Sequence, residues 1–256
     1  MSNLHPSAAA GYAAKSDIYV RGRPDYPEAL QDWLRQDLRL GQGQVVVDLG
    51  AGTGKFVPVL RGIGATVTAI EPVPEMLAQL KLKHPDVDAR IGTAERIPLP
   101  DGSVDAVVCA QAFHWFSSEL VMAEIRRVLR TGGRLGLVWN VRDESVDWVA
   151  GLTRIMAPYE GDVPRYRSMQ WRRPFPAIGF TPLAERVLPH GATGTPEDVI
   201  VARILSVSFI AALPQTEQDR VAVEIRSLIE ASPDLRGRRE VTFPYVTAAF
   251  SCRKLM

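Results

Sequence analysis

The stretch VVVDLGAGTGKF, residues 45–56, decides the fold. Its three β-branched residues, followed by an acidic residue and glycine, predict a short buried strand of a parallel sheet. The three alternating glycines predict a tight turn whose backbone can approach a ligand closely, because no Cβ stands in the way. Apolar residues resume at Phe56, and Pro58 fits the first turn of a helix. The stretch therefore predicts strand, glycine turn and helix in succession.

Two kinds of ligand are bound by turns of this type. A dinucleotide-binding turn has the spacing G-x-G-x-x-G and offers a helix N-terminus to a pyrophosphate. Here the spacing is G-x-G-x-G, and Asp48 stands two residues before Gly50. A carboxylate at this position repels a phosphate but attracts an ammonium group or ribose hydroxyls. This one motif does not decide between the two ligands, and the residues at the ends of the other predicted strands have to be considered as well.

Strands and helices alternate about five times between residues 45 and 139. This alternation predicts a parallel sheet with right-handed crossovers and helices on both faces. With two later strands, the sequence predicts an α/β fold with a doubly wound, mostly parallel seven-stranded sheet. The predicted strands are 45–49, 65–70, 88–91, 104–110, 134–139, 185–188 and 241–252, and the predicted helices include 28–38, 74–83, 118–129, 196–213 and 217–229.

Suitable polar groups follow several of these strands. Glu71 ends the second strand, 23 positions after Asp48, where an acidic residue can accept hydrogen bonds from ribose hydroxyls. The turn of residues 93–95 follows the third strand, and its backbone N–H and the Glu95 carboxylate suit an adenine edge. Because ligands on such sheets lie outside the carboxyl ends of the strands, we expect these groups and residues 110–115 to meet at one edge.

Composition and charge exclude several classes of protein. The chain has 256 residues, 23% of them charged, and a formal net charge of +1, which gives no electrostatic argument for a nucleic-acid partner. Cys109 and Cys252 are too far apart for a zinc pattern or a disulfide framework, and no metal site is predicted. No segment has the roughly 18 apolar residues of a membrane span. Residues 1–10 lack the features of a signal peptide. We expect a cytoplasmic monomer or homodimer without membrane or nucleic-acid partners.

Several strings, in this order and spacing, resemble one protein family. They resemble the class I S-adenosylmethionine-dependent methyltransferases, within them the type-11 branch and its trans-aconitate-methyltransferase-like proteins. The resemblance covers residues 19–140 well and is weakest over 141–238, so the identity of the substrate does not transfer. The matching strings are RPDYP (23–27), DLGAGTG (48–54), AIEP (69–72), GTAE (92–95), IPLP (97–100), QAFHWF (111–116) and FPYVT (243–247).

The resemblance implies S-adenosyl-L-methionine as cofactor and a role for each strand end. The three glycines would let the backbone approach the methionine part, Asp48 would favour its ammonium group or structure the turn, and Glu71 would hold the ribose hydroxyls. The division implied is an N-terminal arm and cap helix (1–40) and a methyltransferase domain (41–256), with 141–175 and 190–238 as substrate-side and lid segments. The expected cofactor-binding residues are Tyr19, Arg23, Asp48, Gly50, Ala51, Gly52, Gly54, Glu71, Pro72, Thr93, Ala94, Glu95, Ala110 and Gln111.

Methyl transfer from a sulfonium is an in-line displacement that chiefly requires alignment and exclusion of water. A base is needed only when the acceptor carries a proton, and His114 is the candidate catalytic base. The alternative is that His114 caps the following helix or binds a carbonyl. Residues 165–173 contain a cluster of arginines that we expect to be solvated surface. The expected substrate-binding residues are Phe113, His114, Trp115, Trp139 and Asn140, with Arg142 as a further candidate.

The predicted function is methylation of a small molecule, with the oxygen of a carboxylate or hydroxyl as leading acceptor. Nitrogen or sulfur acceptors are the alternatives, as is an S-adenosylmethionine-binding protein without transferase activity. An NAD(P)-dependent oxidoreductase is disfavoured by the glycine spacing and by the absence of a Tyr-x-x-x-Lys pair near the fourth strand.

Overall fold

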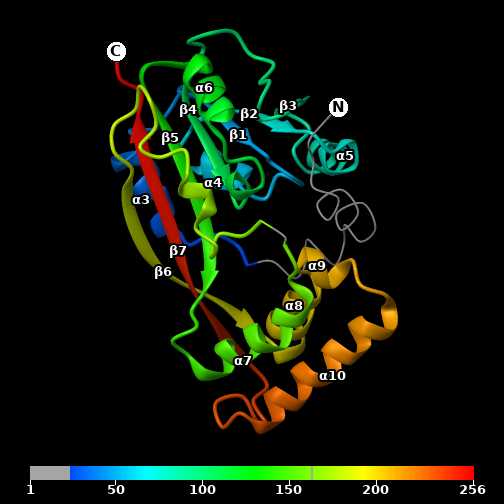
Figure 1. The fold of residues 1–256 in the computed structure, drawn as a ribbon. Helices are drawn as coiled ribbons and strands as arrows, with labels where there is room; N and C mark the ends of the chain where they lie inside the picture. Colours follow the sequence, from blue (N-terminus) through cyan, green and yellow to red (C-terminus); the bar gives the residue numbers. More distant parts are fainter. Residues whose placement is uncertain (1–23, 163) are drawn as a thin grey trace.

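A seven-stranded sheet in the order β3-β2-β1-β4-β5-β7-β6 organises the computed structural model, which describes residues 24–162 and 164–256 (Figure 1). The first five strands run parallel, and β7 runs antiparallel between β5 and β6. The predicted mostly parallel α/β sheet is confirmed. The strands are β1 (Val45–Leu49), β2 (Thr66–Glu71), β3 (Asp88–Ile91), β4 (Val104–Ala110), β5 (Leu129–Arg142), β6 (Ala184–Gly194) and β7 (Val241–Arg253).

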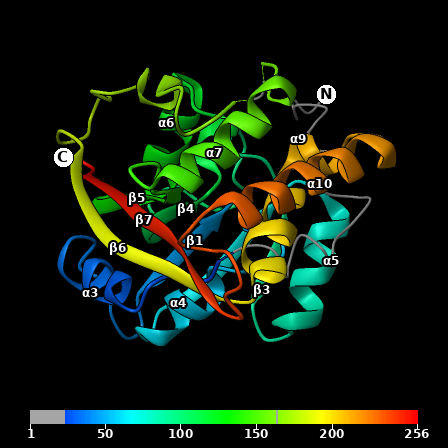
Figure 2. The same cartoon turned by 90° about the horizontal axis from the view of Figure 1, so that it is seen from below.

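Helices cover both faces of the sheet, as predicted (Figure 2). Successive residues of a strand point to opposite faces. Val46 of β1 therefore packs in one apolar cluster with α3 (Ala29–Gln36) and α4 (Val57–Gly62), whereas Val47 packs in another with α6 (Glu119–Val128). The remaining crossover helix, α5 (Pro74–Lys83), lies beside β2 and β3 and has the predicted bounds. The predicted cap helix, α3, thus packs on a face of the sheet.

A second group of helices lies beyond the carboxyl ends of β4 and β5 (Figure 1). It combines α7 (Asp147–Met156), from the β5–β6 connection, with the π-helical turn η4 (Glu197–Ala202), α8 (Arg203–Leu205), α9 (Ser208–Ala211) and α10 (Gln215–Ala231). Trp148, Ile204 and Ile225 share an apolar cluster of their own. We call residues 147–156 and 197–231 the helical subdomain. Two distant chain segments build it together.

The helical subdomain differs from the prediction at two places. Residues 190–194, expected in the lid segment, pair with β7 as the end of β6. The helix predicted over 196–213 is interrupted, because Val207 has extended dihedral angles of −67° and 130°. Just before it, the Ser206 hydroxyl donates to the Arg203 carbonyl at 2.7 Å, and such a bond from a side chain to the preceding turn bends helices.

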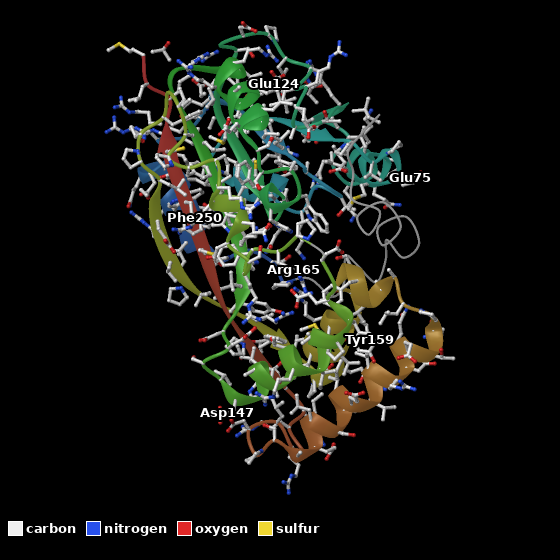
Figure 3. The ribbon with its side chains drawn as sticks, in the orientation of Figure 1. Glu75, Glu124, Asp147, Tyr159, Arg165 and Phe250 are labelled. Atoms are coloured by element: carbon white, nitrogen blue, oxygen red, sulfur yellow. The ribbon has the colours of Figure 1, made fainter. Side chains whose placement is uncertain are left out.

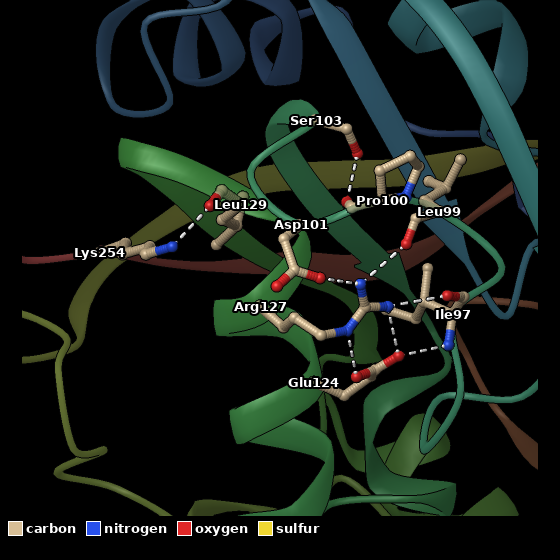
Figure 4. Close-up of polar contacts among 9 residues, drawn as sticks. All are labelled: Ile97, Leu99, Pro100, Asp101, Ser103, Glu124, Arg127, Leu129 and Lys254. Atoms are coloured by element: carbon tan, nitrogen blue, oxygen red, sulfur yellow. Dashed lines mark hydrogen bonds and ion pairs between the residues drawn. The ribbon is translucent and has the colours of Figure 1, made fainter.

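Arg127 of α6 fixes the irregular segment after β3 (Figure 4). Its guanidinium donates to the carbonyls of Ile97 and Leu99 at 3.0 and 2.8 Å, and to both carboxylate oxygens of Glu124 at 2.8 Å. Glu124 in turn accepts the backbone N–H of Ile97 at 2.7 Å. Asp101 closes the network with an ion pair of 2.6 Å. The segment 97–101 is therefore held by side-chain contacts where no regular structure forms.

We expect Arg127→Met to lower the free energy of unfolding by about 2 kcal/mol, because charge-assisted hydrogen bonds are lost while the aliphatic stem remains. Urea denaturation followed by tryptophan fluorescence measures the change. Arg130→Met is the matched control: Arg130 makes a single, more exposed pair with Asp105 at 2.9 Å, and such pairs contribute about 0–1 kcal/mol. Equal losses in the two variants would contradict the role of the network.

Within residues 24–162 and 164–256, every helix is too short or too polar to cross a bilayer. The same described residues contain no group of three histidine, cysteine or acidic side chains arranged to hold a metal ion.

Candidate active site

The glycine turn after β1 adopts a backbone that other residues rarely take. Gly50, Gly52 and Gly54 have φ angles of +72°, +56° and +81°, in the left-handed region. The N–H groups of Gly50 and Ala51 both donate to the carbonyl of Ile70, at 2.9 and 3.1 Å. These bonds fix the turn on the carboxyl end of β2. The strand, turn and helix predicted from residues 45–56 are therefore present.

The three positions require glycine for different steric reasons. A Cβ at Gly50 would lie 2.7 Å from the Cβ of Ala112, and one at Gly54 would lie 2.7 Å from the ring of His84. A Cβ at Gly52 would meet only the Cε of Met76, at an ordinary 3.4 Å. Gly50 and Gly54 are thus required by the packing of the protein itself. At Gly52 only the positive φ, and no close contact within the described residues, favours glycine.

Glu71 lies at the end of β2 with both carboxylate oxygens positioned by the backbone. Oε2 accepts the N–H of Gly52 at 2.9 Å, and Oε1 accepts the N–H of Val73 at 3.0 Å. The side chain is buried; burial raises the pKa of this carboxyl group, and the two hydrogen bonds lower it. Each carboxylate oxygen can accept a second hydrogen bond. Glu71 therefore presents two fixed acceptors side by side.

Asp48 on the neighbouring strand β1 is a buried carboxyl group with one unsatisfied oxygen among the described residues. It is 1% exposed, and its Oδ2 has no hydrogen-bond partner among the residues that the structure describes. Burial and, to a smaller extent, the nearby charge of Glu71 raise the pKa of Asp48 to about 7. An unsatisfied buried carboxylate is costly and calls for an explanation. A ligand that brings a positive charge or hydrogen-bond donors supplies one.

The other expected cofactor residues that the structure describes lie at the ends of β2, β3 and β4 or directly after them. In the turn after β3, Arg96 donates its N–H to Thr93 at 3.2 Å, Ala94 is buried, and Glu95 is exposed. At the end of β4, Gln111 has a positive φ of +59° and donates its N–H to Val138 at 2.8 Å. Pro72 follows Glu71, and Ala110 ends β4, both half-buried. Tyr19 and Arg23 lie outside the described residues.

His114 and Trp139 form one hydrogen-bonded unit. The indole Nε1 of Trp139 donates to Nδ1 of His114 at 3.0 Å. An indole only donates, so Nδ1 is the acceptor and the neutral imidazole carries its proton on Nε2. Trp139 itself is 1% exposed and packs on Trp171, at 4.6 Å between ring centroids. The position of His114 is therefore set by a rigid aromatic core.

A cavity of about 110 Å³ opens beside this unit, between the ends of β4 and β5 and the helical subdomain. It is lined by four of the five expected substrate residues, and Phe113 is the exception because it is fully buried in the core behind them. The expected lining residues are His114, Trp115, Trp139 and Asn140. The others are Gln111, Val141, Arg142, Glu144, Pro164, Arg165, Tyr166, Arg167, Arg203, Val207 and Ser208.

One of the arginines corrects the prediction of a solvated surface cluster: Arg165 is half-buried, whereas Arg167 is exposed, as expected. Arg165 and Arg167 line the cavity, and Figure 3 places Arg165 between the sheet and the helical subdomain. Arg165 pairs with Glu160 at 3.0 Å and its guanidinium lies 4.2 Å above the ring of Phe209. Charge in the sequence does not distinguish a solvated arginine from one folded inward. Nothing in the sequence indicated that Arg203 would line the cavity.

The N-terminal part that the structure describes also reaches this region. The carbonyl of Asp25 accepts a hydrogen bond from Asn140 Nδ2 at 3.0 Å and lies 2.7 Å from His190 Nε2. Its carboxylate pairs with Lys55 at 3.1 Å. The segment before α3 is therefore anchored to both β5 and β6 near the cavity.

The comparisons with known proteins agree on one family, the methyltransferases. The methyltransferase domain family Methyltransf_11 matches residues 47–137. An uncharacterized methyltransferase-like protein of Schizosaccharomyces pombe is 39% identical over 243 residues and covers 94% of each chain. An uncharacterized methyltransferase of Mycobacterium tuberculosis is 40% identical over 90% of this chain and 89% of its own. A solved structure from Anaeromyxobacter dehalogenans, provisionally assigned as a type II methyltransferase, has a TM-score of 0.63 at 25% identity and covers 91% of this chain and 97% of its own.

The residues at the sheet edge fit the cofactor of this family. Two neighbouring acidic side chains, one with an unsatisfied buried oxygen and one with two oriented acceptors, suit a cationic ligand that carries ribose hydroxyls. They suit a pyrophosphate poorly. The chain belongs to the class I S-adenosylmethionine-dependent methyltransferases and binds S-adenosylmethionine.

Proposed function

We propose that this protein transfers the methyl group of S-adenosylmethionine to an oxygen atom of a small molecule, a carboxylate or a hydroxyl. The observation that supports the proposal is the cavity, which lies at the ends of β4 and β5 and is lined by side chains from β5 and the helical subdomain. In the sheet, β4 is the direct neighbour of β1, which carries Asp48. A cavity of about 110 Å³ suits a small molecule or part of one.

In this proposal, the acidic pair and the glycine turn hold the cofactor. Glu71 accepts the ribose hydroxyls, Asp48 faces the ammonium group, and residues 50–54 contact the methionine part. Pro72 and the turn of residues 93–95 lie toward the adenine, and Ala110 and Gln111 lie toward the cavity. The bound cofactor supplies an electrophilic methyl group on a sulfonium. Residues 141–175 and 190–238 form the substrate side of the domain, and the helical subdomain excludes water as a lid.

The proposed role of His114 is to orient the acceptor by donating a hydrogen bond from Nε2. To act as a base at Nε2, His114 would have to shift its proton to Nδ1 and give up the bond from Trp139. A carboxylate is already ionised at neutral pH and needs no base. The contact with Trp139 therefore favours a carboxylate oxygen over a hydroxyl among the two proposed acceptors.

The experiment that tests the proposal is transfer of radiolabelled methyl from S-adenosylmethionine to a panel of carboxylic acids, phenols, amines and thiols. We expect label on carboxylic acids in products that release methanol in base, as methyl esters do. Label found only on nitrogen or sulfur would contradict the assigned acceptor atom. Binding of the cofactor without transfer to any acceptor would contradict the proposed activity.

Two substitutions of His114 distinguish donor from base. We expect His114→Gln, whose amide still donates, to keep kcat within about tenfold, and His114→Leu to lose about tenfold more, as for one lost hydrogen bond. Steady-state kinetics with the identified acceptor measure both. A general base contributes about 10²–10⁴-fold, so an equal loss of that size in both variants would show that His114 is the base.

A further inference from the structure

The cavity carries more positive than negative charge. Four arginines line it, Arg142, Arg165, Arg167 and Arg203, against one carboxylate, Glu144, among the described lining residues. Arg167 pairs with Glu144, and Arg165 pairs with Glu160. The lining is therefore positive on balance, and Arg142 and Arg203 both contribute to that charge.

Arg142, the last residue of β5, forms no ion pair among the described residues, although the charge of Glu144 acts on it. Its Nε is buried and has no hydrogen-bond partner there, and its Nη1 contacts the sulfur of Met156 at 3.6 Å. Burial and, to a smaller extent, the nearby charge of Arg203 lower the pKa of Arg142 to about 9. A buried guanidinium beside a second cation is costly unless an anion lies beside it, and Arg142 is in this position.

A second unsatisfied donor lies across the strand pair. Tyr245 of β7 is the direct cross-strand neighbour of Arg142, and such neighbours project from the same face of a sheet. Its hydroxyl is buried and has no partner among the described residues, while its ring stacks on Phe243 at 4.7 Å between centroids. Native proteins seldom leave buried donors unpaired. Here two of them belong to adjacent residues at the end of β5.

We propose that Arg142, with Arg203 and Tyr245, forms a subsite for an anionic group, a carboxylate or a phosphate, that is part of the acceptor and is not itself methylated. Arg142 and Arg203 line the same cavity as His114, and Tyr245, outside the lining, is the cross-strand neighbour of Arg142. Resting on the proposed function, this gives the substrate class: a small molecule with a second anionic group beside the methyl-accepting oxygen. An arginine fork is well suited to this recognition, because it binds carboxylate or phosphate through two parallel hydrogen bonds.

Binding of simple anions tests the subsite without methyl transfer. The wild-type protein, saturated with S-adenosylhomocysteine, is titrated with succinate, inorganic phosphate and uncharged succinamide, and the fluorescence of the cavity tryptophans is followed. We expect succinate or phosphate to bind at least tenfold more tightly than succinamide. Tighter binding of phosphate would indicate a phosphate-bearing acceptor, and tighter binding of succinate a dicarboxylate. Equal binding of all three probes would overturn the proposal.

Substitution of Arg142 locates the effect. We expect Arg142→Met to weaken binding of the preferred anion at least tenfold and to leave the affinity for S-adenosylhomocysteine unchanged. Arg154→Met is the matched control, because Arg154 is an exposed residue of α7 outside the cavity lining, and it should bind the anion like the wild type. Wild-type anion affinity in Arg142→Met would overturn the assignment.

Two further results distinguish a folding defect of the variant from a failure of the subsite, and a failure of the proposed function from a failure of the subsite. If Arg142→Met does not fold, Arg142→Lys keeps the charge but loses the fork, and we expect weaker but measurable anion binding; complete retention of wild-type affinity would contradict the fork. Absence of methyl transfer to every acceptor, with anion binding intact, would overturn the proposed function and not the subsite.

Discussion

Replacement of Glu71 by alanine is expected to weaken the binding of S-adenosylmethionine more than tenfold in a calorimetric titration. Hydrogen bonds to a charged group contribute about 1.5–3 kcal/mol, and this carboxylate is proposed to accept both ribose hydroxyls. The substitution also removes the acceptor for the N–H groups of Gly52 and Val73, at 2.9 and 3.0 Å. The glycine turn and the start of α5 therefore lose a common anchor as well.

Glu75→Ala provides the control for this prediction. Glu75 lies in the first turn of α5, at the same edge of the sheet, but its side chain is exposed (Figure 3). The substitution makes the same change in charge and size, and we expect cofactor affinity within about twofold of wild type because exposed charges interact weakly through water. If Glu71→Ala bound S-adenosylmethionine as tightly as the wild type does, the proposed position of the ribose at the end of β2 would be wrong.

The unliganded protein is expected to lose stability as the pH rises from about 4 to about 7, because of Asp48. Its pKa in the folded state, about 7, lies above the reference value of 3.8. The folded state therefore holds the proton more tightly than the unfolded state, and this contribution is complete below the unfolded pKa and lost as the pH passes the folded pKa. Three pH units correspond to about 4 kcal/mol at most.

Urea denaturation at pH 4.5 and pH 8, with Asp48→Asn as reference, measures this contribution. The asparagine keeps the size of the side chain and cannot titrate. Glu71, whose pKa is also raised, is present in both proteins. The difference between the two proteins in how the free energy of unfolding changes with pH therefore reports on Asp48. We expect the wild type to lose several kcal/mol more than the variant over this range. The same pH dependence in both proteins would show that Asp48 does not hold a proton when folded.

The same carboxyl group links cofactor binding to protons. An ammonium group beside Asp48 favours the charged carboxylate, so binding at pH 6 is expected to release a proton, and affinity should rise by up to about tenfold per pH unit below pH 7. Calorimetry in two buffers of different ionisation enthalpy measures the release, which Asp48→Asn should abolish. Binding without proton release at pH 6 would place the ammonium group elsewhere.

The cofactor edge could be predicted from sequence because its signals are local. The β-branched run, the glycines and the acidic residue all lie within residues 45–56, and Glu71 directly ends the next strand. Parallel strands then bring these separate signals to one edge without any further information. The seven strands were predicted for the same reason, although β5 and β6 extend beyond the predicted bounds.

The substrate side could not be predicted in the same way. Arg142, Arg203 and Tyr245 come together through the antiparallel register of β5 and β7 and through packing of the helical subdomain, neither of which leaves a periodic pattern in the sequence. The hydrogen bond from Trp139 to His114 also joins two strand ends, and neither stretch of sequence alone indicates that it forms. The interruption near Ser206 depends on a side-chain bond to the backbone that competes with helix continuation.

A crystal structure of the protein with S-adenosylhomocysteine tests the central claim most directly. We predict that both ribose hydroxyls donate to Glu71, that the amino group lies against Asp48, and that the sulfur faces the cavity lined by His114 and Arg142. A nucleoside bound away from the ends of β1 and β2, or a sulfur turned away from this cavity, would contradict the account.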